Sequence, residues 1–462
     1  MWEKPVYRFR VPTKEESDEL QEIVLDVTGS APPFTDVKDT MKGVFEKLLS
    51  EEGRRATSVL DFGAAKLRNT LYFLNKGKKV CAVEFEELPK RSEDARMILE
   101  ECQKNVNFES LVFPHPFIEH DGRYDLVLLI NVIPVMPVFA ERLLVLQILY
   151  EKVNDGKYVL WYAQKEGSSY KRIREAGEND LGDGIWMGTT RRFKTFYKYH
   201  AVEDVDEMMS LAGFEFIKKF AGKGNDVRLY QKTEHNIFKG VIEQENVAET
   251  IPTDLTIKDP EDAELKVIKG GRGVMEIIPN PSSLSLENLY KKALVQVAPG
   301  PENAERYHRL VSRIVYRVFR GSLRNMKIKQ EMNEGLKVID TVYLNNAETG
   351  FFAKLARNFQ IKCPYIIAEA KNYSVDPKNP EFDQLAGRLN NDVGKFGILV
   401  SRNIEDVEAA ERRCQSYLSD GKYVIFFVDA DLTNLLELYQ DGDTEGIGDF
   451  MDGKLRPLVF RS

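Results

Sequence analysis

The runs VID at residues 338–340 and IIAEAK at residues 366–371 have the apolar, β-branched composition of strands in this 462-residue chain. Because side chains alternate across a strand, Glu369 and Lys371 share one face. An acid and a lysine on a largely apolar strand are costly to bury without a partner. A divalent cation would be such a partner, and Asp340 supplies a second carboxylate. The two runs therefore predict a hard oxygen site suited to Mg²⁺.

The chemistry that fits these three residues is hydrolysis of a phosphodiester bond. Two carboxylates would hold the metal, which polarises the phosphate and lowers the pKa of a bound water. Lys371 would position or activate that water. Taken alone, a Glu-x-Lys tripeptide is more typical of the exposed edge of a strand. The prediction therefore depends on the motifs around it.

The motif order in the last third of the chain resembles that of the restriction-endonuclease-like, or PD-(D/E)XK, nucleases. The matching positions are Asp340, the EAK tripeptide at residues 369–371, the QLAGR run at 384–388 and the apolar run at 396–400. The resemblance implies an α/β/α domain with a mixed central sheet and Mg²⁺-dependent DNA cleavage. It gives Asp340, Glu369 and Lys371 the roles described above.

The same resemblance implies two further catalytic positions. Gln384 would be an accessory polar group near the phosphate. An acid on the helix before the core would join the site, and Glu305 is the nearest match, with Glu331 and Glu334 as rivals. The insert between residues 345 and 364 is longer than a tight hairpin needs and predicts a helix or a lid.

A row of arginines precedes the predicted metal site. These residues recur at steps of three or four, the spacing of one helical face, and are Arg309, Arg313, Arg317, Arg320 and Arg324. They predict contact with the phosphates of DNA, and the alternative is a solvated face of an amphipathic helix. The net charge of −8 argues mildly against a wholly basic DNA binder, but affinity depends on local patches.

The first half alternates apolar strands, at residues 58–61, 79–83, 124–130 and 157–162, with helical segments. Such strands joined by helices predict a parallel sheet covered on both faces. Glu84 follows Gly63 by about twenty residues, which is where a doubly wound nucleotide-binding fold has its ribose-hydroxyl acceptor.

This half resembles the class I S-adenosylmethionine-dependent methyltransferases. Asp61 and Gly63 match the first motif, Glu84 the ribose acid, and Asn131 the end of the strand that carries reaction-side residues. Two glycines of the usual loop are replaced by Ala65 and Leu67, whose side chains would narrow the approach to a ligand. The NVIP run at 131–134 and the aromatic and basic run at 183–199 resemble methyltransferase-like proteins associated with DNA phosphorothioation.

The predicted organisation is a Rossmann-like methyltransferase-type domain at 1–234, a linker with a small extra element at 235–284, and a nuclease-like domain at 285–462. Near the N-terminus we expect helices around 15–25 and 37–49, and within the linker short strands at 267–268 and 274–278. No apolar run reaches the ~20 residues of a membrane helix, and no signal-peptide core is evident, so we expect a cytoplasmic protein.

The preferred interpretation is a Mg²⁺-dependent DNA endonuclease acting in restriction or defence against foreign DNA. Its methyltransferase-like half would recognise DNA, a methyl donor or a partner protein of a defence system. One alternative is a single-chain restriction-modification enzyme that also methylates DNA. Another is a non-catalytic DNA-binding scaffold. RNA remains a possible substrate, and cleavage of both strands of a duplex would favour a homodimer.

Overall fold

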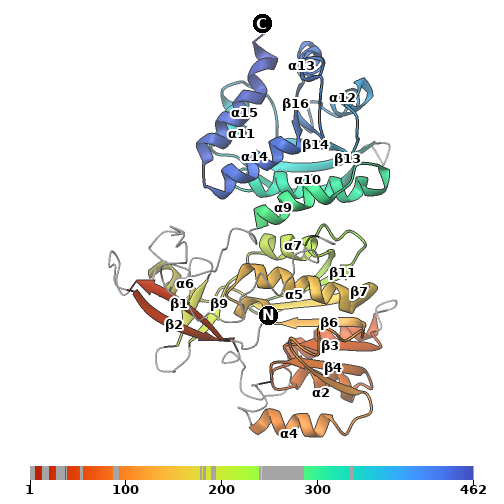
Figure 1. Cartoon of the computed structure of the whole chain (residues 1–462), viewed down its shortest axis with the longest axis vertical. Coiled ribbons are helices and arrows are strands. Elements are labelled where there is room, and N and C mark those ends of the chain that lie inside the picture. The colour runs from red at the N-terminus through yellow and green to blue at the C-terminus, as the bar shows by residue number, and fades with distance from the viewer. Residues whose placement is uncertain are drawn as a thin grey trace. The chain divides into compact units, whose positions relative to one another are not determined.

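The computed structural model describes residues 6–12, 20–27, 37, 39–51, 56–86, 93–176, 179, 184–188, 194–238, 241, 286–332 and 337–460. The chain divides into two compact units, Met1–Ser282 and Ser283–Ser462 (Figure 1). Most of the predicted linker, including its two expected strands, lies outside the described residues. Within those residues, no helix has the length and apolar character needed to span a bilayer.

The first unit is built on a seven-stranded sheet with the order β10-β11-β7-β6-β3-β4-β5. Its strands are β3 (Ser58–Phe62), β4 (Lys79–Glu84), β5 (Phe108–Val112), β6 (Tyr124–Ile130), β7 (Val153–Gln164), β10 (Phe214–Phe220) and β11 (Asn225–Lys232). The five neighbouring strands β7, β6, β3, β4 and β5 are parallel to one another, whereas β11 is antiparallel to both of its neighbours, β10 and β7. The order reverses between β3 and β6, as in doubly wound Rossmann-like folds, whose ligands bind outside the carboxyl ends of the strands at that point.

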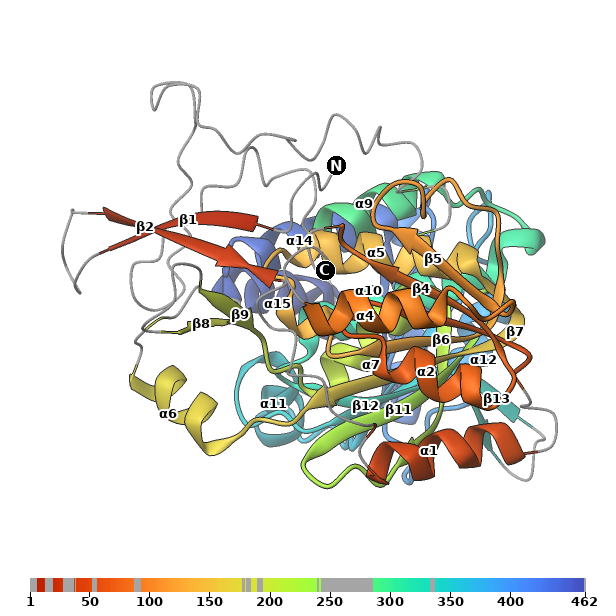
Figure 2. The same cartoon turned by 90° about the horizontal axis from the view of Figure 1, so that it is seen from below.

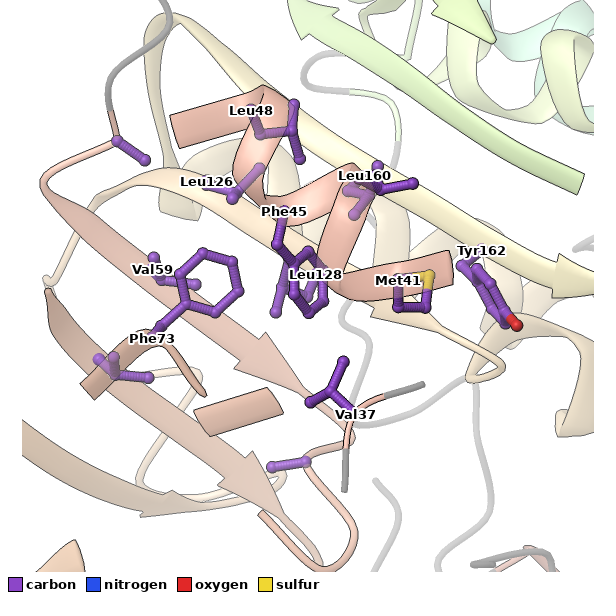
Figure 3. Packing of buried hydrophobic residues seen from close by; sticks show 14 of the residues in the cluster. Val37, Met41, Phe45, Leu48, Val59, Phe73, Leu126, Leu128, Leu160 and Tyr162 are labelled. Atoms are coloured by element: carbon purple, nitrogen blue, oxygen red, sulfur yellow. The ribbon is translucent and has the colours of Figure 1, made fainter. Parts of the chain in front are cut away.

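Helices cover this sheet because the central strands are apolar on both faces. They are α1 (Asp39–Ser50), α2 (Arg68–Asn75), α4 (Glu93–Cys102), α5 (Phe139–Lys152) and α7 (Val202–Leu211), whereas α6 (Ser168–Ala176) lies beside the short strand Ile185–Met187 (Figure 2). Figure 3 shows Phe45 of α1 and Phe73 of α2 packed against the strand residues Val59 and Leu128. The two phenylalanine rings lie 4.8 Å apart between centroids, and all four side chains are buried.

Two strands near the N-terminus correct one expectation. The predicted helix at 37–49 is confirmed by α1, but the predicted helix at 15–25 is wrong where the structure describes it. Residues Leu20–Asp26 form β2, which pairs antiparallel with β1 (Val6–Pro12). Ile23 and Leu25 are buried while Val24 between them is partly exposed, which is the period of a strand. Figure 2 shows the pair near β8 (Ile185–Met187) and β9 (Thr195–Tyr197).

The second unit contains a five-stranded mixed sheet with the order β12-β13-β14-β15-β16. Its strands are β12 (Leu323–Met332), β13 (Lys337–Asn345), β14 (Tyr365–Lys371), β15 (Phe396–Ser401) and β16 (Tyr423–Val428). The pairs from β12 to β14 are antiparallel and those from β14 to β16 are parallel. The mixed sheet expected from the sequence is therefore present.

Helices lie on both faces of this sheet. They are α9 (Leu286–Gln296), α10 (Ala304–Phe319), α11 (Gly350–Arg357), α12 (Asn379–Ala386), α13 (Val407–Ser416), α14 (Asp429–Gln440) and α15 (Thr444–Val459). The side chain of Thr341 on β13 meets α10, whereas Glu369 on β14 meets Arg388 at the end of α12. Helix α11 confirms the helix expected in the long insert between β13 and β14.

Candidate functional sites

The carboxylates of Asp340 and Glu369 come together on one face of the second sheet. The backbone N–H of Asp340 lies 3.4 Å from Oε1 of Glu369. In return, the backbone N–H of Ala370 lies 3.4 Å from Oδ2 of Asp340. Each carboxylate thus reaches the backbone of the other's strand. Glu369 is fully buried and Asp340 is partly exposed, so the pair lies at the boundary between the core and solvent.

Two cationic side chains and one amide surround this pair. Lys371 donates a 2.8 Å hydrogen bond from Nζ to Oε1 of Gln384, and the same Nζ lies 3.7 Å from Oε2 of Glu369. The guanidinium of Arg388 contacts Oε1 of Glu369. Gln384 lies in the last turn of α12 and Arg388 follows the end of that helix, and each contacts a residue of β14. Sequence reasoning missed Arg388.

The donor set fits a hard divalent cation. Two adjacent carboxylates are the oxygen ligands that Mg²⁺ prefers, and Mg²⁺ usually keeps several waters, so two protein ligands suffice. Among the residues that the structure describes, Oε2 of Glu369 accepts no hydrogen bond although it is buried. In the same part of the chain, no group of three or more His, Cys, Asp or Glu side chains is arranged to hold a metal. Metal binding by Asp340 and Glu369 therefore stays a prediction.

A hydrogen-bonded cluster behind Asp340 fixes β13 to α10. Nε2 of His308 lies 2.9 Å from Oγ1 of Thr341, and Oγ of Ser312 lies 2.6 Å from the same oxygen. Burial lowers the pKa of His308, and the nearby charge of Asp340 opposes that shift only in part. A neutral imidazole thus anchors the strand directly beside the carboxylate pair.

The expected role of Glu305 stays a prediction. Its carboxylate accepts a 2.8 Å hydrogen bond from Nε of Arg309 and pairs with Nζ of Lys329 at 2.6 Å. Burial raises the pKa of Glu305, but these two cations outweigh it and the pKa is lowered. The side chain of the rival Glu331 and the whole of Glu334 lie outside the described residues.

The arginine row follows α10 as far as its C-cap, Arg320, but its last member does not, which corrects part of the sequence interpretation. Helix α10 ends at Phe319, so Arg324 lies on β12 instead. The Nε atom of Arg317 pairs with Glu287 at 3.1 Å, and its guanidinium lies over the ring of Tyr439. Arg309 is paired with Glu305, Arg313 is partly buried, and Arg320 is exposed. Contact of this row with DNA stays a prediction.

In the first unit, the loop after β3 approaches the switch point between β3 and β6. Asp61 is buried at the end of β3, where Thr70 donates a 2.7 Å hydrogen bond to it, and burial raises its pKa. Gly63 has a φ of +71°, and a Cβ there would lie 2.6 Å from Cγ2 of Val132. Only glycine satisfies both conditions without strain.

Ala65 and Leu67 adopt backbone conformations that usually favour glycine, with φ of 49° and 61°. The side chain of Leu67 is buried in the core, so it does not narrow the loop in the way that the sequence suggested. The N–H of Ala65 donates to Oε2 of Glu84 at 2.8 Å, and the N–H of Phe85 donates to Oε1 at 2.9 Å. Burial raises the pKa of Glu84 to about 7, against the effect of these hydrogen bonds.

Asn131 lies directly after β6, on the other side of the switch point. Its φ is 57°, and its backbone N–H donates to the carbonyl of Tyr162 at 2.8 Å. Among the described residues, its side-chain Oδ1 is buried without a hydrogen-bond partner. Gly63, Glu84 and Asn131 thus lie at the carboxyl ends of adjacent parallel strands. In the aromatic run at 183–199, Arg191 and Arg192 are outside the described residues, and Phe196 is a buried core residue of β9.

No protein-family model matches the chain, and no curated protein matches it. Solved structures similar to its N-terminal region include the 1,6-didemethyltoxoflavin-N1-methyltransferase of Burkholderia thailandensis with bound S-adenosylhomocysteine, at 19% identity, 42% of this chain, 79% of that chain and TM-score 0.32. A SAM-dependent methyltransferase of Methanosarcina mazei is 14% identical, with 43% of this chain and 99% of that chain covered and a TM-score of 0.35. The magnesium protoporphyrin IX methyltransferase of Synechocystis with bound S-adenosylhomocysteine is 14% identical, with 42% of this chain and 82% of that chain covered and a TM-score of 0.32.

The loop after β3 offers a matched pair of glycines for a stability test. Gly63 and Gly77 share a φ of +71°, but a Cβ at Gly77 meets no atom within 4 Å. We expect Gly63→Ala to lower the free energy of unfolding by about 1–3 kcal/mol more than Gly77→Ala, because only the former adds a clash. Urea denaturation followed by circular dichroism measures both. Adding Val132→Ala to Gly63→Ala should recover most of the difference; equal losses in the two single variants would refute the packing argument.

Proposed function

We propose that the chain is a metal-dependent DNA nuclease whose first unit binds S-adenosylmethionine. The observation that carries the nuclease proposal is the mutual approach of Asp340 and Glu369 from two strands, with Lys371 at 3.7 Å from Glu369. The buried carboxylate of Glu369 beside a second carboxylate is unfavourable without cations. Restriction or defence against foreign DNA is the biological role that such an activity would serve.

In this proposal Asp340 and Glu369 hold a Mg²⁺ ion. When bound, the ion polarises the scissile phosphate and acidifies a water ligand. The ammonium of Lys371 is fixed by its hydrogen bond to Gln384, which leaves two of its three N–H donors for water or phosphate. Water oxygen attaches to phosphorus and the P–O bond to the leaving sugar oxygen breaks, so one product carries a phosphate and the other a hydroxyl. Cutting both strands of a duplex would need two copies of the chain.

The proposal for the first unit rests on the arrangement at the switch point. Glu84 already accepts two backbone N–H groups, but a carboxylate has about four lone-pair sites and can accept two ribose hydroxyls as well. Gly63 carries no side chain, and the side chain of Leu67 is buried in the core, so neither residue covers the outer side of the loop after β3. S-adenosylmethionine is the ligand that these features and the methyltransferase resemblance favour.

Methyl transfer to DNA is a second candidate function. The observation that favours it is the buried, unpaired Oδ1 of Asn131 among the described residues. A buried amide oxygen without a partner costs about 1–3 kcal/mol, and an amino group on a nucleobase would satisfy it. The left-handed backbone conformation of Asn131 is a second unusual feature, and strained conformations of this kind are common at functional sites.

The nuclease proposal is tested by plasmid cleavage in Mg²⁺. We expect Asp340→Ala and Lys371→Ala to reduce the cleavage rate by about a hundredfold or more, because each removes a group that stabilises the transition state. Glu408→Gln is the control, since Glu408 is an exposed carboxylate on α13. Cleavage that proceeds equally in wild type and the two alanine variants would reject this site.

Donor binding is tested by titrating S-adenosylmethionine into the full chain in a calorimeter. We expect Glu84→Ala to weaken binding by about tenfold or more, since hydrogen bonds to a charged acceptor are lost. Because the pKa of Glu84 is about 7, wild-type affinity should fall as the pH drops below that value and the carboxylate becomes protonated. Glu100→Gln, on the exposed side of α4, is the matched control. No binding heat in the wild type would remove this proposal.

Methyl transfer is tested with a donor labelled on its methyl group and the Lys371→Ala variant, which is expected to leave DNA intact. Label should pass to DNA, and Asn131→Ala should reduce the transfer rate by about a hundredfold, because a group that orients the acceptor is lost. If the donor binds and no label transfers, the first unit is a binding module and this second candidate is wrong.

A further inference from the structure

Arg388 and Asp340 approach the same oxygen of Glu369. Glu369 is 0% exposed and Arg388 is 8% exposed. The Arg388 guanidinium contacts Oε1 of Glu369, and the Asp340 backbone N–H lies 3.4 Å from that same oxygen. Burial lowers the pKa of Arg388, and the nearby charge of Asp340 opposes that shift. The guanidinium is thus close to both carboxylates that would hold a cation.

The charges of this group balance without a metal. Asp340 and Glu369 contribute two negative charges, and Lys371 and Arg388 contribute two positive charges. A buried carboxylate that lacked these partners would be strongly destabilised. Oε1 of Glu369 faces the backbone of Asp340, and Arg388 contacts that same oxygen, so a cation bound through Oε1 would have to displace the guanidinium.

We propose that Arg388 is the counter-ion of Glu369 in the metal-free protein, that Mg²⁺ displaces its guanidinium, and that the displaced guanidinium then binds the phosphate of the DNA. This inference rests on the proposed nuclease function. Arg388 follows the C-terminal end of α12 at Gly387, and Gln384, one turn earlier on the same side, contacts Lys371. A planar guanidinium suits this exchange because it forms paired hydrogen bonds with either a carboxylate or a phosphate.

The exchange predicts opposite effects of one substitution on metal affinity and on DNA affinity. Mn²⁺ binding to the full chain, measured by electron paramagnetic resonance, should be about tenfold tighter in Arg388→Gln than in wild type, because the competing charge is gone. A salt bridge with a purely structural role would leave Mn²⁺ affinity unchanged or weaken it. Either of those results, in a variant with wild-type circular dichroism, overturns the proposal.

The second measurement follows the displaced guanidinium. In a Lys371→Ala background that is expected not to cleave, binding of a short DNA duplex is measured with and without Mg²⁺. Adding Arg388→Gln should reduce DNA affinity about tenfold with Mg²⁺ and much less without it, because Arg388 reaches the phosphate only after the metal binds. An equal reduction under both conditions overturns the proposed exchange.

Two further variants separate the possible failures. Arg388→Lys retains the positive charge and should bind Mn²⁺ within about threefold of wild type while losing Mg²⁺-dependent DNA affinity, since an ammonium cannot form the paired hydrogen bonds. If Arg388→Gln does not fold, the DNA-binding measurement on Arg388→Lys still tests the proposed exchange. Glu369→Gln should lose Mn²⁺ binding. If wild type itself binds no Mn²⁺, the proposed nuclease function fails; if wild type binds and Arg388→Gln binds no tighter, only the exchange fails.

Discussion

The second unit depends on neutralisation of one buried carboxylate. Glu369 lies within an apolar strand and is fully buried, and an ionised carboxylate in such a position costs several kcal/mol without partners. Its partners come from three places: Lys371 on the same strand, Arg388 after α12 and the backbone of Asp340 on β13. The charge therefore fixes how β13 and α12 meet β14, and the same contacts assemble the candidate site.

In the first unit the comparable constraint is backbone strain. Ala65, Leu67 and Asn131 all have positive φ, and each such non-glycine residue costs about 1–3 kcal/mol. The surrounding contacts compensate: Glu84 accepts the N–H of Ala65, and Leu67 is buried among core side chains. Residues with such strain often lie at functional sites, and these three flank the switch point, which is where doubly wound folds bind their ligands.

Sequence patterns predicted those parts of the chain that depend on local order. The alternation around Glu369 predicted the face that it shares with Lys371, and apolar runs located β3, β6 and β15. Interactions between distant segments were not predictable in this way. Lys329 reaches Glu305 from a strand beyond the helix, and the spacing of the arginines continues to Arg324 although α10 has ended. At Leu20–Asp26 a short apolar run fits either period, and pairing with β1 decides in favour of the strand.

The two candidate sites would respond to their ligands in different ways. The oxygens of Glu84 accept two backbone N–H groups and retain lone pairs, so ribose hydroxyls would add to an existing arrangement. The Glu369 oxygen that lies toward Asp340 is in contact with a guanidinium, so a cation would have to exchange with it. Exchange favours a divalent ion, because a monovalent ion gains about half as much Coulomb energy from the same carboxylates. Under the proposed exchange, the Arg388 guanidinium would therefore also select divalent over monovalent cations.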